Sequence, residues 1–186
     1  MKAGQAGLWI GGPHANPYFR RFIAARAHYV MARVATRTLH AEPAVLLAEQ
    51  SIESYIKAIR GIAGEPEVRG HDLIELLEAA PAPRPQYFDQ VLGNDRMRGF
   101  LDGLTRGYLD GARYGEIAWG LNFRAMCEEL DELALNLDRV FREREPRAGR
   151  RLYVPSALRD YVLDGNTFLS KDDVTDNMLA IAGQTD

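Results

Sequence analysis

A long apolar seam in the second half of the chain constrains the fold more than any other feature. Its members follow one another at spacings of 4, 3, 4, 3, 4 and 3 residues: Trp119, Phe123, Met126, Leu130, Leu133, Leu137 and Val140. This alternation keeps one face of an α-helix apolar and lets its side chains pack into holes on a neighbouring helix. Acidic residues crowd the first half of the segment and arginines its end, which suits the helix dipole. The seam therefore predicts a long helix packed against other helices.

Apolar residues also recur at helical spacing in earlier segments, which are residues 17–40, 42–61, 72–77 and 87–92. Pro17 suits a first helical turn, and the Asp72 carboxylate can cap the free N–H groups of the short third segment. Outside residues 150–155, which could be extended, no strong strand pattern is present. The sequence thus predicts an all-α, up-and-down bundle of about five helices with a C-terminal extension.

The composition is that of an ordinary globular domain. The chain has 186 residues, of which 46% are hydrophobic and 26% charged, and its net charge of -3 gives no general attraction to nucleic acid or membrane. Cys127 is the only cysteine, so no internal disulfide forms, and no apolar run approaches the length of a membrane span. The apolar run near the N-terminus is only Leu8-Trp9-Ile10, which argues against a signal peptide, so we expect a cytoplasmic protein.

The chain divides into three regions. Residues 1–16 are rich in glycine and lack periodicity, which is typical of a flexible N-terminal arm. Residues 17–145 form the predicted bundle, and residues 146–186 form the C-terminal extension. Within the extension, Ser170 and Asp173 resemble a capping box before a short helix that ends near Ala182.

Glycine recurs every four residues after the fourth helical segment, at Gly99, Gly103, Gly107, Gly111 and Gly115. Each interior glycine costs a helix about 1 kcal/mol relative to alanine, so either close backbone packing offsets the loss or the helix is interrupted. A spacing of four keeps the glycines on one helical face, where a neighbouring helix or a second subunit would fit. Arg113 and Tyr114 would then line a groove between subunits, although a salt bridge of Arg113 and core packing of Tyr114 are equally consistent with the sequence.

Two stretches of the chain resemble a known family. Residues 49–59 (EQSIESYIKAI) and 70–77 (GHDLIELL), joined by a glycine-bearing loop, look like the second and third helices of HEPN domains. The run Arg113-Tyr114-Gly115, followed by the apolar seam, resembles the region of the family's fourth and fifth helices. The resemblance covers residues 17–145. It implies a bundle of about five helices, often dimeric, of the kind found in toxin–antitoxin and RNA-directed defence modules and beside small nucleotidyltransferases.

The catalytic motif of the family's ribonucleases is missing. Active members resemble one another in an arginine followed four to six residues later by a histidine, which acts as general base or acid on a ribose 2′-OH. Here no histidine follows Arg113. Arg33 and His40 share one helical face but lie in the first helix, and His71 either acts on a ligand or holds its loop. The resemblance therefore implies a non-catalytic, homodimeric binding or regulatory module, with a divergent metal-independent ribonuclease using an Arg/His pair as the alternative.

An arginine cluster is the one local feature able to attract phosphates. The arginines that would contact phosphate are Arg139, Arg142, Arg147, Arg150 and Arg151. Glu143 and Glu145 are interleaved with them and weaken the patch, so we expect at most weak RNA binding. The sequence carries no P-loop, dinucleotide fingerprint, paired-cysteine pattern or Glu-x-x-His motif, so it predicts no cofactor and no metal site.

Overall fold

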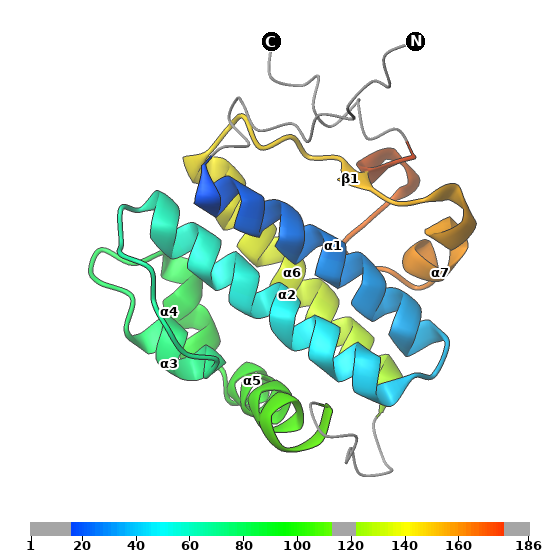
Figure 1. Ribbon diagram of the computed structural model, residues 1–186, viewed down its shortest axis with the longest axis horizontal. Coiled ribbons are helices and arrows are strands. Elements are labelled where there is room, and N and C mark those ends of the chain that lie inside the picture. Colours follow the sequence, from blue (N-terminus) through cyan, green and yellow to red (C-terminus); the bar gives the residue numbers. More distant parts are fainter. Residues whose placement is uncertain (1–15, 113–121, 177–186) are drawn as a thin grey trace, which may run out of the picture.

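The computed structural model describes residues 16–112 and 122–176. Its elements in chain order are α1 (Pro17–Arg37), α2 (Ala41–Ile62), α3 (Leu73–Glu78), α4 (Gln86–Leu92), α5 (Asp95–Arg106), the π-helical segment η2 (Gly107–Ala112), α6 (Phe123–Arg144), β1 (Leu152–Tyr153), η3 (Ser156–Leu158), α7 (Arg159–Leu163), η4 (Lys171–Asp173) and β2 (Val174–Thr175). The predicted all-α bundle is confirmed (Figure 1). None of the helices in the two described ranges combines the length and the apolar character that a membrane crossing requires.

Three long helices build the core of the bundle. α1 and α2 form an antiparallel hairpin, and α6 lies against both of them (Figure 1). The Phe22 and Phe141 rings stack between these helices with centroids 4.1 Å apart, and Tyr55 meets Phe22 edge-on at 5.8 Å. Trp119 lies outside the described residues and Phe123 is half-buried. The rest of the predicted seam is buried in this core, at Met126, Leu130, Leu133, Leu137 and Val140.

Side-chain caps set the starts of several helices. The Asp72 carboxylate accepts hydrogen bonds from the backbone N–H groups of Ile74 and Glu75 at 2.9 and 3.0 Å. This confirms the predicted start of the third helix, because the cap satisfies donors that have no partner within the helix. Asn16 caps α1 in the same way, ahead of a proline whose missing N–H is not needed there.

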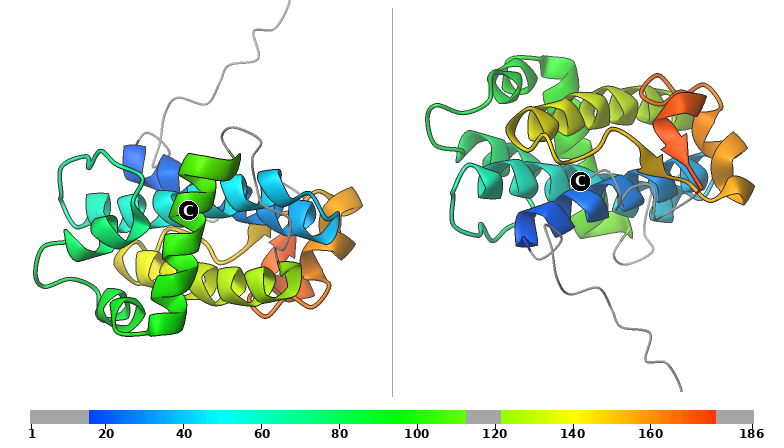
Figure 2. Two further views of the ribbon diagram at one scale, coloured as in Figure 1. Left: turned by 90° about the horizontal axis from the view of Figure 1, so that it is seen from below. Right: turned by 90° about the horizontal axis from the view of Figure 1, so that it is seen from above.

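The glycine-rich helix α5 crosses α2 and α6 instead of running beside them (Figure 2). The chain stays helical from α5 into η2, so this part of the glycine run is no loop. A Cβ atom on Gly107 would lie 2.8 Å from Val45 Cγ1, which is close packing within the chain. Gly99 and Gly103 are exposed, and a Cβ atom on either would meet nothing within 4 Å. Of these three glycines, only Gly107 is therefore explained by close packing inside the chain.

The C-terminal extension carries two short strands. β1 and β2 pair in parallel, in the register Leu152↔Val174 and Tyr153↔Thr175. The predicted capping box is present, with Ser170 and Asp173 bonded reciprocally. It opens only the 3-10 turn η4, because the β-branched residues Val174 and Thr175 extend into β2. The helix predicted from here toward Ala182 is therefore wrong at residues 174–175, and residues 177–186 lie outside the described part.

Buried arginines of α1 hold the extension on the bundle. Arg26 pairs with Asp138 of α6, and Arg33 pairs with Asp131 of α6. The same two guanidinium groups donate to backbone carbonyls of the extension, which belong to Arg151, Val162 and Asp164. Each arginine therefore bonds two segments at once, which offsets the cost of burying its charge. The extension packs as part of the bundle.

Candidate functional site

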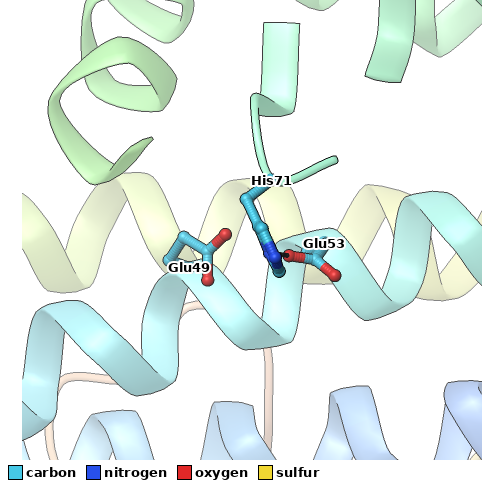
Figure 3. A group of neighbouring side chains, drawn as sticks. All are labelled: Glu49, Glu53 and His71. Atoms are coloured by element: carbon cyan, nitrogen blue, oxygen red, sulfur yellow. Dashed lines mark hydrogen bonds and ion pairs between the residues drawn. The ribbon is translucent and has the colours of Figure 1, made fainter. Parts of the chain in front are cut away.

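Two glutamates of α2 and a histidine from the loop before α3 form a polar cluster. Glu49 and Glu53 lie one helical turn apart, and His71 reaches toward them from its loop (Figure 3). His71 Nδ1 lies 2.7 Å from Glu53 Oε2. Both glutamates are buried, whereas 46% of the His71 side chain is exposed. Solvent therefore reaches the cluster through the His71 side chain.

Several contacts fix the loop that carries His71. Lys57 Nζ donates to Glu53 Oε1 at 2.7 Å and to the carbonyl of Gly70 at 2.8 Å. Gly70 has a φ of 122°, which L side chains rarely adopt, so glycine allows the loop to turn at this point. The Tyr108 ring of η2 lies with its centroid 5.4 Å from that of the His71 ring. Elements α2 and η2 thus position the imidazole together.

Burial and mutual repulsion give the two glutamates different protonation states. Burial, followed by the neighbouring charge of Glu53, raises the pKa of Glu49 from 4.5 to about 8. Glu49 Oε2 accepts a hydrogen bond from Gln50 at 2.7 Å, but no described residue bonds to Glu49 Oε1, which is buried. Burial also acts to raise the pKa of Glu53, yet hydrogen bonds from Lys57 and His71 outweigh it and hold that pKa below 4.5. At neutral pH, Glu49 therefore holds a proton while Glu53 is ionised.

The cluster can supply acid–base or ligand chemistry. One ligand atom from each of Glu49, Glu53 and His71 lies within 4.8 Å of the others, and the described residues form no second group of this kind. A histidine whose Nδ1 is bonded to a carboxylate keeps Nε2 for a proton or a metal. These residues do not form a Glu-x-x-His motif, because the histidine comes 18 residues after Glu53. The available sequence signal is two glutamates at i and i+4 beside the apolar stripe of α2.

The predicted Arg33/His40 pair does not form a cleft. Arg33 is 1% exposed and its guanidinium lies 3.3 Å from the Asp131 carboxylate. It also donates to the carbonyl of Asp164 at 2.6 Å. His40 is exposed ahead of α2, with Nδ1 3.0 Å from the Thr38 hydroxyl. Arg33 therefore has no surface from which to contact a substrate.

Three of the five predicted phosphate-contact arginines line one surface hollow of about 220 Å³: Arg139, Arg142 and Arg150. Arg142 pairs with Asp138 at 2.6 Å, and Arg150 pairs with Asp173 at 2.7 Å. These carboxylates offset much of the positive charge that a phosphate would meet. The hollow is therefore a weaker anion site than the arginine count indicates.

The other predicted site residues lie elsewhere. Arg147 pairs with Glu145 at 2.6 Å, and neither Arg147 nor Arg151 lines the hollow. Gly111 belongs to η2, whereas Arg113 and Tyr114, the predicted groove residues, lie outside the described residues. The interface prediction therefore depends on the exposed face of α5.

Comparison with known proteins gives no match to a family model, to a curated protein or to a solved structure. The resemblance to HEPN domains therefore stays a prediction from the sequence.

Proposed function

We propose that the protein is a non-catalytic, HEPN-like binding module that acts as a homodimer in the cytoplasm. The observation that carries this proposal is the burial of Arg33, which is 1% exposed and ion-paired with Asp131. An arginine that stabilises a phosphate during RNA cleavage has to reach the substrate. Arg33 is instead ion-paired with Asp131 and bonded to backbone carbonyls inside the bundle, which favours a structural role for the arginine of the predicted Arg/His pair.

The exposed face of α5 is the proposed dimer surface. Gly99 and Gly103 lie on this face, and a Cβ atom on either would meet no described residue within 4 Å. Their helix-propensity cost of about 1 kcal/mol each therefore has no offset among the described residues of one subunit. A helix of a second copy, packed closely over both glycines, would offset this cost.

The further partner is a protein of a toxin–antitoxin or defence system, such as a small nucleotidyltransferase, and RNA binding is weak.

A metal-independent ribonuclease is the second candidate function. The observation that favours it is the 2.7 Å contact between His71 Nδ1 and Glu53 Oε2. A carboxylate at Nδ1 orients an imidazole so that Nε2 acts as general base or acid. His71 is also partly exposed, as a group that meets a substrate must be.

Sedimentation and an RNA-cleavage assay test both candidates on the full chain with EDTA present. We expect a species of twice the 20.8 kDa chain mass and no cleavage. A 20.8 kDa species alone at micromolar concentration contradicts the dimer. Cleavage that is lost in His71→Ala but kept in the matched control His40→Ala would replace the binding function with the ribonuclease.

A further inference from the structure

The geometry points to a divalent transition-metal site formed by the Glu49 and Glu53 carboxylates and the His71 imidazole. This inference goes beyond the proposed binding function and is independent of it, because an ion can be bound without any RNA cleavage. The three side chains converge on one space beside α2 from two separate segments (Figure 3).

The distances fit an ion after small side-chain shifts. The three ligand atoms all lie within 4.8 Å of one another. Ligands on opposite sides of an ion with bonds of about 2.1 Å lie about 4.2 Å apart, and neighbouring ligands about 3 Å apart. His71 Nδ1 and Glu53 Oε2 are 2.7 Å apart in a hydrogen bond, and a bound ion would replace the proton between them, which is released to solvent. The two atoms would then occupy neighbouring positions after a slight separation, with His71 binding through Nδ1 and keeping its proton on Nε2. Glu49 then closes the third position by a rotation of its carboxylate.

An unsatisfied buried atom points to a ligand at the same place. Glu49 is completely buried, and its Oε1 has no hydrogen-bond partner among the described residues. Buried polar atoms in folded proteins are nearly always bonded, and an orphan of this kind is typically satisfied by a bound water or ion. Lys57 holds Glu53 Oε1 and leaves Glu53 Oε2 to the imidazole side. The Lys57 ammonium therefore orients the Glu53 carboxylate and leaves its Oε2 atom for the ion.

The ligand types select the class of ion. Carboxylate oxygens suit Mg²⁺, Ca²⁺ and Mn²⁺, whereas an imidazole nitrogen favours Zn²⁺, Fe²⁺ and related ions. A site with two carboxylates and one imidazole suits ions that accept both donors, such as Mn²⁺, Fe²⁺ and Zn²⁺. Mg²⁺ prefers oxygen ligands and keeps its waters, so it should bind much more weakly.

Calorimetric titration of the chelator-treated full chain with MnCl₂, ZnCl₂ and MgCl₂ tests the site. We expect one Mn²⁺ or Zn²⁺ per chain, at least tenfold weaker Mg²⁺ binding, and a higher melting temperature with the bound ion. Glu49→Gln, Glu53→Gln and His71→Ala should each weaken Mn²⁺ and Zn²⁺ binding at least tenfold. The matched control is Glu42→Gln, an exposed glutamate on the same helix, which should bind as the wild type does.

Three outcomes would overturn the inference. One is the absence of binding heat and of any change in the Mn²⁺ electron paramagnetic resonance signal at millimolar ion. Another is binding that all three substitutions leave intact, since the ion would then lie elsewhere. The third is binding that survives His71→Ala, because the imidazole would not be a ligand. His71 is partly exposed, so this variant should fold, and its circular dichroism spectrum checks that it does.

Discussion

Glu49 is an acid placed where its charge is disfavoured. Burial and the adjacent Glu53 raise its pKa to about 8, against 4.5 for the ordinary side chain. The folded state therefore holds this proton more tightly than the unfolded chain does. Stability from this source is fully present below pH 4.5 and is lost as the pH rises through about 8. The metal-free protein should consequently become less stable toward alkaline pH.

Glu49→Gln should remove that pH dependence, because the amide is a neutral isostere of the protonated acid. With EDTA present, we expect the variant to match the wild type at pH 5 and to be more stable by roughly 1 to 3 kcal/mol at pH 9. Urea unfolding followed by circular dichroism at several pH values measures the difference. Glu42→Gln is the control and should keep the wild-type slope. Parallel wild-type and Glu49→Gln profiles would contradict the raised pKa.

Single residues differ in how far a sequence predicts their roles. The cap at Asp72 is predictable because it depends only on N–H groups within the next turn. The burial of Arg33 is not, because its partner Asp131 belongs to a helix far along the chain. The same holds for His71, whose contact with Glu53 depends on where a loop is directed. Contacts within one helical turn can be predicted from the sequence, whereas contacts between residues far apart in the chain cannot.

Among elements, α5 offers a matched test of two glycines. Gly103→Leu should leave the fold intact, since a Cβ there meets nothing within 4 Å, but it should abolish the proposed dimer. Gly107→Leu should destabilise the fold by about 1 to 3 kcal/mol, because its Cβ would lie 2.8 Å from Val45 Cγ1. Sedimentation measures the assembly, and urea unfolding at low protein concentration measures the fold.

Two results would contradict these predictions for α5. A Gly103→Leu variant that remains dimeric would show that this face of α5 is not the interface. A Gly107→Leu variant as stable as the wild type would show that η2 moves away from α2 at little cost. Gly103→Ala is the milder control, and it should stabilise the monomer by about 1 kcal/mol through helix propensity alone.

Periodicity predicts whole elements better than it predicts their ends. The seam of α6 is recognisable because each member repeats a spacing set by the helix itself. The capping box at Ser170 marks a helical start, but the residues that follow it decide what forms, and they pair with β1. The change from α5 to η2 has no signal in the spacing of glycines. Tertiary contacts select these endings.

At the scale of the whole molecule, paired charges limit nucleic-acid binding. We expect weak binding of single-stranded RNA at the hollow of Arg139, Arg142 and Arg150, lost near physiological salt. Replacing Arg139 and Arg150 by alanine should lower the salt slope by about 1.4, which corresponds to two phosphate contacts on a single strand. Filter binding across salt concentrations measures the slope. Arg147→Ala is the control outside the hollow, and tight binding at physiological salt would refute the expectation.

The arginines that hold the extension also set an order for folding during synthesis. A ribosome delivers α1 and α6 before residues 151–164, whose carbonyls Arg26 and Arg33 require. Until those residues emerge, both guanidinium groups have donors without acceptors, which opposes their burial. The three long helices should therefore close less stably on a nascent chain than in the whole protein, although their apolar core and ion pairs are already available. A chain that stalls before residue 151 should therefore expose its apolar seam to chaperones and proteases more often than the finished chain does.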